Sequence, residues 1–243
     1  MKKTVLLIIL GVLTVGCIIF GTVKHVGGGF RNLKNSGFFF DWDDEDEYDS
    51  DYTGKLEISE NLKSFSSIKM DVHVMEIIIE EGSDFKIESS FNKERIKPVY
   101  SVEGGVLEIK QANTRVKGFS NGNFRCRVVI TVPKGSSLKN ITIDSNVGDI
   151  KLRDLEADKI DLTVNVGEID VRKVDFEDLS CDTNVGEIEV NLNDSVENYN
   201  ISAATDVGQV EVDGHSYKRS YNSRGSGSKN ITLSGNVGEI NIR

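Results

Sequence analysis

The chain has 243 residues, a formal net charge of −10 and a hydrophobic fraction of 38%. This length suits one extended domain with appendages, and the charge argues against a nucleic-acid-binding protein, because phosphate backbones attract basic surfaces. Residues 1–54 contain five Lys and Arg and eight Asp and Glu, so the remaining residues contain 24 and 31, a net charge of −7. The main body of the chain is therefore acidic in its own right.

Residues 1–23 begin with Met-Lys-Lys and continue with twenty mostly apolar residues without a charge. A run of this length spans a bilayer as a helix, and the preceding lysines favour a cytoplasmic N-terminus. We therefore expect a single-pass anchor in the cell membrane and an extracytoplasmic C-terminal domain. Two alternatives stay open. One is a cleaved signal peptide, although no Ala-x-Ala-like cleavage pattern follows the apolar run. The other is a lipoprotein, because Leu-Thr-Val-Gly-Cys ending at Cys17 resembles a lipobox, with Thr14 where Leu is usual.

Residues 24–54 are predicted to form a tether. Three consecutive glycines at residues 27–29 make the segment flexible. Residues 41–51 contain eight acids. Such a run repels itself and stays extended.

Residues 55–135 show short stretches in which apolar and polar side chains alternate, as is typical of β-strands. Residues 68–79 follow the spacing of the repeats described below, with Met75 where a glycine is expected, so the bend there needs another shape. Residues 100–109 predict a hairpin around two glycines, and residues 126–132 predict a strand that ends at a Pro-Lys-Gly turn. We interpret this segment as an irregular β-rich start that covers the first coil of the repeats.

The phrase Asn-Val-Gly-Asp/Glu-Ile recurs through residues 136–243, together with one looser copy, Asp-Val-Gly-Gln-Val. Apolar residues alternate on both sides of each glycine, which indicates strand, bend and strand rather than helix. A nearly fixed period predicts stacked coils with parallel strands about 4.8 Å apart. The expected fold is an all-β, parallel β-helix or β-solenoid preceded by one transmembrane helix. The repeat glycines, spaced by 19, 19, 22 and 30 residues, are Gly148, Gly167, Gly186, Gly208 and Gly238.

The same register predicts two polar columns on the surface of the coils. An amide ladder, with hydrogen bonds between neighbouring side chains, is expected from Asn146, Asn165, Asn184, Asp206 and Asn236, with His73 in the upstream copy. A carboxylate column is expected from Asp149, Glu168, Glu187, Gln209 and Glu239. Carboxylates at this spacing repel one another. Two interpretations stay open: the side chains splay into solvent on an outer face, or a cation lies between them.

No motif in the sequence indicates catalysis. The three histidines, His25, His73 and His215, do not form a metal-ligand spacing with the cysteines, and there is no Gly-x-Ser-x-Gly elbow, phosphate-binding loop or Cys-x-x-Cys pair. We therefore expect no enzyme activity, no cofactor and no metal, while a glycosidase pair among the many acids stays open. Cys126 and Cys181 fall at inward-facing positions and are expected to be buried free thiols or, as the alternative, a disulfide.

The longest gap between repeats contains the candidate binding residues. This insertion is basic and aromatic on an otherwise acidic body, and insertions in solenoids form loops that often carry binding. Lys and Arg could contact phosphate or carboxylate groups of an envelope polymer, and Tyr could stack on sugar. The alternative is a mobile, solvated loop. The candidates are Tyr217, Lys218, Arg219, Tyr221 and Arg224.

Several stretches of the sequence resemble a known family. Residues 132–138 read Val-Pro-Lys-Gly-Ser-Ser-Leu and are followed by the apolar alternation at residues 141–143 and by the repeat phrase ending at Ile150. Together with the hairpin at residues 102–109, they are similar to the bacterial putative-adhesin family of unknown function, over roughly residues 55–243. The resemblance implies an extracytoplasmic, often membrane-tethered β-solenoid, similar to proteins encoded near cell-envelope stress systems. It implies no catalytic residues.

The sequence favours a non-enzymatic module for cell-surface or envelope interaction. The expected partners are the membrane and either an anionic wall polymer or a membrane protein, with no nucleic acid. Two alternatives are an accessory regulator of a membrane sensor in an envelope-stress response and a polysaccharide-active enzyme. The last coil, ending at Arg243, is expected at the exposed end of the solenoid. An open edge there invites strand addition and homo-oligomerisation.

Overall fold

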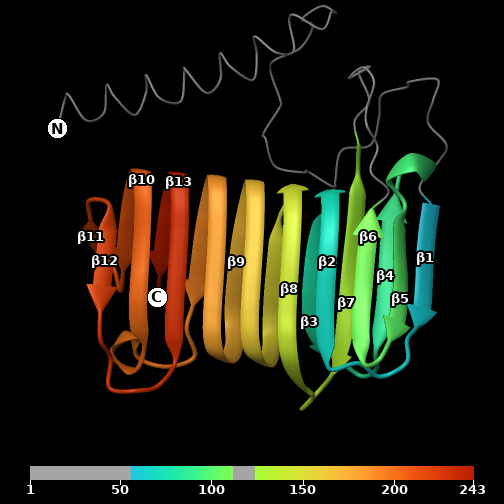
Figure 1. The fold of residues 1–243 in the computed structure, drawn as a ribbon, viewed down its shortest axis with the longest axis horizontal. Helices are drawn as coiled ribbons and strands as arrows, with labels where there is room; N and C mark the ends of the chain where they lie inside the picture. Colours follow the sequence, from blue (N-terminus) through green and yellow to red (C-terminus); the bar gives the residue numbers. More distant parts are fainter. Residues whose placement is uncertain (1–55, 112–123) are drawn as a thin grey trace, which may run out of the picture. The chain divides into compact units, whose positions relative to one another are not determined.

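The computed structural model describes residues 56–111 and 124–243. This part of the chain is all-β, and one sheet curls into a stack of coils (Figure 1). The predicted anchor at residues 1–23 and the tether at residues 24–54 lie outside the described residues. Within the described ranges, no helix has the length and apolar character needed to cross a membrane.

Thirteen strands and two short 3-10 helices make up this part of the chain. In chain order they are β1 (Leu56–Asn61), β2 (Ser67–Val74), β3 (Glu76–Gly82), β4 (Lys86–Phe91), η1 (Glu94–Ile96), β5 (Pro98–Glu103), β6 (Val106–Gln111), β7 (Cys126–Pro133), β8 (Ser137–Val147), β9 (Ile150–Asn191), η2 (Val196–Asn198), β10 (Asn200–Val212), β11 (His215–Tyr217), β12 (Ser220–Ser223) and β13 (Asn230–Ile242). The long β9 follows the chain through successive coils.

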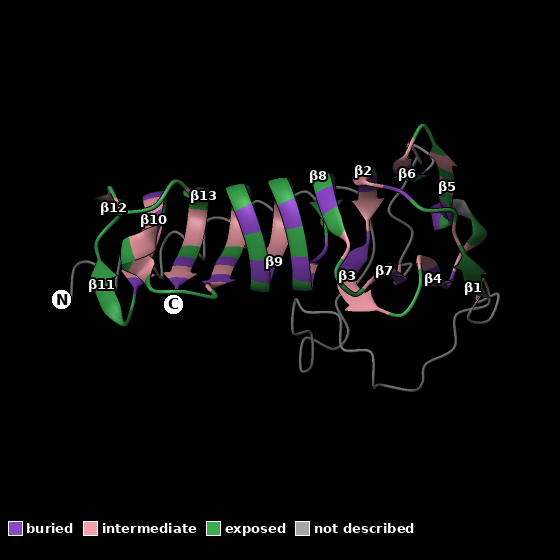
Figure 2. Ribbon diagram, turned by 90° about the horizontal axis from the view of Figure 1, so that it is seen from below, coloured by how far each residue is buried: buried purple, intermediate pink, exposed green. Residues whose placement is uncertain are grey.

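Each repeat coil has one arm before its bend and one arm after it, and neighbouring coils pair in parallel and in register. Ile68 of β2 pairs with Ile141 of β8, which pairs in turn with Ile160 of β9. Beyond the bend, Ile77 pairs with Ile150. Buried and exposed positions alternate along each arm (Figure 2), so the apolar side chains form continuous columns inside the stack. The predicted parallel coils with an aliphatic interior are confirmed.

The glycine bends are the points at which successive backbones approach most closely. A Cβ atom at Gly186 would lie 1.7 Å from the carbonyl oxygen of Gly167, and one at Gly167 would lie 2.0 Å from that of Gly148. The φ angle at Gly186 is 153°, a region that L side chains rarely adopt. Glycine is therefore required at the bend for two reasons: its backbone conformation and the space available beside it.

The first coil has Met75 in place of this glycine. Met75 is fully buried, is absent from the described residues with positive φ, and donates its amide to the carbonyl of Val147 at 3.0 Å. The side chain of Gln111 occupies the place of a preceding coil. Its Oε1 accepts from the amides of His73 and Val74 at 2.9 Å, and its Nε2 donates to the carbonyl of Val74 at 3.0 Å. Because an amide side chain and not a backbone covers this bend, a residue with a side chain is tolerated here.

The segment before the repeats closes the first coil with both parallel and antiparallel strands. Strands β6 and β7 pair in parallel with β2 and β3. Antiparallel β5 and β4 follow on their outer sides, and β1 pairs with β4. The predicted hairpin is confirmed as β5–β6, with φ angles of 58° at Gly104 and 78° at Gly105.

The last two coils lie in the reverse of their sequence order. Strand β13 pairs in parallel with β9 on one side and with β10 on the other. The coil at residues 231–242 therefore lies between those at residues 179–190 and 201–212, as Figure 1 shows for β13. The expectation that the coil ending at Arg243 is the exposed end is wrong. Residues 213–229 give the chain enough length to turn back, so the regular repeat phrase of β13 is paired on both sides and the looser copy is left outermost.

Replacement of Gly186 by Ala tests the close approach at the bend. We expect the free energy of unfolding, measured by urea denaturation, to fall by about 3–5 kcal/mol, because the methyl group meets a backbone carbonyl that packed neighbours hold in place. The control is Gly135→Ala, where φ is +75° and nothing lies within 4 Å of the new Cβ. The control should lose only about 1–2 kcal/mol for its left-handed backbone. Equal losses would contradict the packing argument.

Candidate functional site

The amide column forms a hydrogen-bonded ladder along the bends. Each Nδ2 donates to the residue one coil nearer the start of the stack, over 2.8 Å from Asn146 to Nδ1 of His73, 2.8 Å from Asn165 to Asn146 and 2.7 Å from Asn236 to Asn184. Asn184 donates to Asn165 in the same way. The predicted ladder is confirmed for these residues, and its order follows the reversed coils. Asp206, next to Asn236 in the register, is exposed, and no hydrogen bond of this series in the described ranges reaches it.

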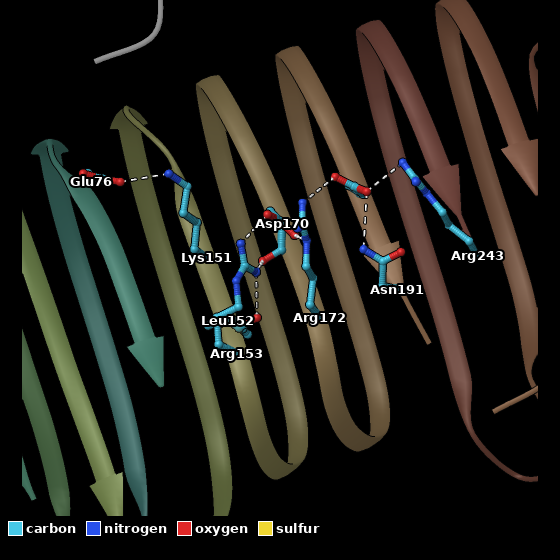
Figure 3. Close-up of polar contacts among 9 residues, drawn as sticks. Glu76, Lys151, Leu152, Arg153, Asp170, Arg172, Asn191 and Arg243 are labelled. Carbon is cyan, nitrogen blue, oxygen red and sulfur yellow. Dashed lines mark hydrogen bonds and ion pairs between the residues drawn. The ribbon is translucent and has the colours of Figure 1, made fainter. Parts of the chain in front are cut away.

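Alternating carboxylates and guanidinium groups cross-link the arms that follow the bends (Figure 3). Asp170 is buried and bonds to Arg153 and, at 2.8 Å, to Arg172. Glu189 contacts Arg172 at 3.0 Å and Arg243 at 2.7 Å. These residues belong to four coils that are adjacent in the stack, so the ion pairs connect each coil to the next. Attraction between oppositely charged neighbours offsets the repulsion expected along a column of carboxylates.

The expectation of a solvated outer face is wrong for Asp149. This residue is only 8% exposed, and its Oδ1 accepts a hydrogen bond from the amide of Glu168 at 3.1 Å. Its short side chain stays against the backbone of the next coil, whereas the longer Glu187 and Glu239 reach solvent. Burial raises the pKa of Asp149. Burial also raises the pKa of Glu168, with further contributions from the negative charges of Asp149, Asp170 and Glu187.

Three acids on this face have the spacing of a cation site. Oxygen atoms of Glu168, Asp170 and Glu189 lie within 4.8 Å of one another. Asp170 and Glu189 already have arginine partners, which neutralise the charge that would attract a cation. The array therefore acts in this structure as an ion-pair network between coils.

The candidate binding residues lie on the strands and connections that end the stack, a region we call the end cap (residues 213–224). Strand β11 pairs antiparallel with the second arm of β10 and β12 with the first arm, so both cover its outer edge. The insertion is not a loop throughout, because residues 215–217 and 220–223 are paired strands. A signal for the turn was present in the sequence: Asp213-Gly214, with φ angles of 50° and 71°, is a typical two-residue hairpin turn.

The end cap brings the two tyrosines together and separates the cations. The ring centroids of Tyr217 and Tyr221 are 4.7 Å apart, and the rings are tilted by 53°. Lys218 and Arg219 lie between β11 and β12, where the carbonyl of Arg219 accepts from the amide of Thr205 at 2.8 Å. Arg224 follows β12 and lies about 16 Å further along the chain at the usual rise per strand residue. The five candidates therefore line one edge and do not form a single cluster.

The three cations of the end cap are exposed and have no acidic partner in the described ranges. Elsewhere on the domain, Lys151, Arg153 and Arg172 are engaged in ion pairs, whereas Lys63, Lys69 and Lys139 are exposed like the cations of the end cap. The end cap differs from these lysines in placing its cations beside the paired rings of Tyr217 and Tyr221. Arg224 also borders a shallow hollow together with Asn200, Asn222, Asn230 and Thr232 and two isoleucines, Ile201 and Ile231. The end cap can therefore offer positive charge, aromatic surface and hydrogen-bonding side chains to a ligand.

Cys126 and Cys181 are free and buried, so the disulfide alternative is wrong. Burial raises the pKa of the Cys126 thiol to about 12, and that of Cys181 is raised by burial as well. Both thiols stay protonated at neutral pH and act as small apolar side chains of the core.

The chain belongs to the Toastrack DUF4097 family, whose profile matches residues 65–191 and 135–243. This assignment confirms the family resemblance of the sequence. No curated protein matches the chain in the comparison with such proteins.

One solved structure supports the fold. A crystal structure described as a putative cell adhesion protein from Clostridium sporogenes has a TM-score of 0.62 and 21% identity, over 78% of this chain and 99% of that chain. A putative adhesin from Bacteroides fragilis matches with a TM-score of 0.38 and 12% identity, over 79% of this chain and 99% of that chain. At such identities the first of these supports the architecture only, and the second carries no weight.

Replacement of Asp149 by Asn tests the cost of its buried charge. The amide oxygen can still accept from Glu168, so we expect the free energy of unfolding at pH 7 to rise by on the order of 1 kcal/mol. Because the pKa of Asp149 is raised in the folded state, the folded chain binds this proton more tightly than the unfolded chain does. The charged carboxylate therefore destabilises the folded state fully at pH values above the native pKa. This destabilisation disappears as the pH falls to the ordinary pKa of 3.8.

Urea unfolding of both proteins from pH 7 to pH 4 measures this effect. The stability difference should narrow as the pH falls. A variant less stable than the parent at pH 7, or a difference independent of pH, would show that the Asp149 carboxylate is stabilised in its charged form.

Proposed function

We propose that this chain is a non-enzymatic attachment module of the cell envelope. Residues 1–23 anchor it in the cell membrane, and the coils stand outside the cytoplasm. The end cap binds an anionic envelope polymer. The observation that carries this proposal is the combination of three exposed cations without acidic partners, Lys218, Arg219 and Arg224, with an adjacent pair of tyrosine rings at the end of an otherwise acidic domain. Cations left free of internal partners keep their full capacity to pair with phosphate or carboxylate groups.

The position of the end cap supports this role. Strand β1, which follows the proposed tether in the chain, lies at one end of the stack in Figure 1, and β11 and β12 lie at the opposite end. A domain held at β1 therefore presents its end cap on the side away from its attachment. Tyr217 is 37% exposed and offers a ring face on which a sugar can stack. The related fold of the protein described as a putative cell adhesion protein is consistent with attachment.

A triple replacement of Lys218, Arg219 and Arg224 by Ala tests the proposal. We expect residues 55–243 of the parent to sediment with isolated cell envelope at low salt and to be released at high salt, because exposed ion pairs are screened. The triple variant should lose most of this retention, on the order of tenfold, if each lost contact is worth a few tenths of a kcal/mol or more. The measurement is the bound fraction as a function of salt.

The matched control removes the same charge elsewhere. Lys63, Lys69 and Lys139 are exposed on the first part of the domain, and their replacement by Ala should leave retention nearly unchanged. If both triple variants lost retention equally, the net charge of the domain would explain the binding, and the assignment of the binding site to the end cap would be wrong. Absence of retention by the parent at any salt would instead favour a protein partner in the membrane, as expected for an accessory regulator of a sensor.

A further inference from the structure

The C-terminal coil fills a slot whose two walls precede it in the sequence. One wall is the coil at residues 179–190 and the other is the coil at residues 201–212. In the sequence, the second wall and the end cap come first, and the chain then returns so that residues 231–242 lie between the two walls (Figure 1). Without that coil, each wall in this arrangement has one unpaired parallel edge, and a strand added between the walls satisfies both.

The slot is selective for a strand of this particular repeat. A Cβ atom at Gly238 would lie 1.6 Å from the carbonyl oxygen of Gly186, and one at Gly208 would lie 1.8 Å from that of Gly238. A glycine is therefore required at the bend of the inserted strand against one wall, and at Gly208 of the other wall against the inserted strand. The side chains of the insert also continue the ladders of the wall: Asn236 donates to Asn184 at 2.7 Å, and Asn241 donates to Glu187 at 2.6 Å.

The insert is joined to the rest of the chain by a short hinge at residues 224–229. The hinge lies against the crossover around η2, where the amide of Gly225 donates to Oδ1 of Asn200 at 3.2 Å and that of Ser226 to the carbonyl of Glu197 at 2.9 Å. Every pairing that fills the slot is made by residues beyond this hinge. These pairings are therefore the same whichever copy of the chain supplies the coil.

We propose that the slot accepts the C-terminal coil of a second copy of this chain, so that two copies exchange residues 230–243. Such an exchange keeps both parallel ladders, both close glycine approaches and the ion pair between Arg243 and Glu189, and it changes only the path of the hinge. The fraction of chains in the exchanged form then rises with protein concentration, by mass action.

A disulfide trap on the full chain tests the exchange. Thr232 of β13 pairs in register with Ser180 of β9, so cysteines at these two positions meet only where a C-terminal coil occupies a slot. One copy carries Ser180→Cys and the other Thr232→Cys, both in a Cys17→Ser background, while Cys126 and Cys181 are buried. The two are mixed in urea, refolded in mild detergent at increasing concentration and then oxidised. We expect a disulfide-linked pair whose yield rises with protein concentration.

Thr142→Cys is the matched control for Ser180→Cys. Thr142 occupies the same column on an earlier coil and pairs with Asp161, so it meets position 232 only in random collisions. The Ser180/Thr232 mixture should exceed the Thr142/Thr232 mixture by at least about tenfold, since pairing holds the two thiols at a high effective concentration. Addition of Gly238→Val to the Thr232→Cys copy should abolish the excess. Equal yields from both mixtures at every concentration would overturn the proposal.

A chain that carries both Ser180→Cys and Thr232→Cys tests whether the two positions are adjacent within one copy. At low concentration it should form the disulfide within one chain and remain a monomer on gel filtration. Failure to form that bond would show that coil 231–242 does not lie beside coil 179–190, and this result would contradict the proposed exchange.

Discussion

The close approach of consecutive backbones at the glycine bends determines the rest of this structure. Gly167 and Gly186 leave no room for a Cβ atom beside the carbonyl of the preceding coil, and this fixes the register of each coil on the next. Once the register is fixed, side chains at equivalent positions must stack in columns. The aliphatic core, the amide ladder and the ion-pair array are therefore three consequences of one constraint.

A stack of parallel coils has two ends, and the two are closed by different means. At the first coil, the buried Gln111 side chain takes the hydrogen bonds that a preceding backbone would make, and antiparallel strands continue outward from there. At the other end, the short strands β11 and β12 pair with β10. Figure 2 shows β11 as exposed. Closure by short, polar strands protects the sheet edge and also presents the unpaired cations on which the proposed attachment depends.

Much of the architecture follows from the sequence because the repeat makes it local. The bend glycines, the alternating arms and the asparagine ladder all depend on the spacing within one coil and its neighbour. The order of the coils in the stack does not depend on this local spacing, because any coil with this pattern can pair with any other. The burial of Asp149 also depends on the length of its side chain relative to Glu187 at the equivalent position, and the pattern treats the two alike. The pairing of β11 and β12 was signalled only by the Asp213-Gly214 turn.

The order of the coils is the claim from which the end cap, the slot and the ladder sequence all follow. Hydrogen–deuterium exchange of the backbone amides tests it most directly. If β13 lies between β9 and β10, its amides are protected on both sides and should exchange as slowly as those of β9, while β11 and β12 exchange first. If the coils instead followed their order in the sequence, β13 would form the outer end, and its amides would exchange faster than those of β10.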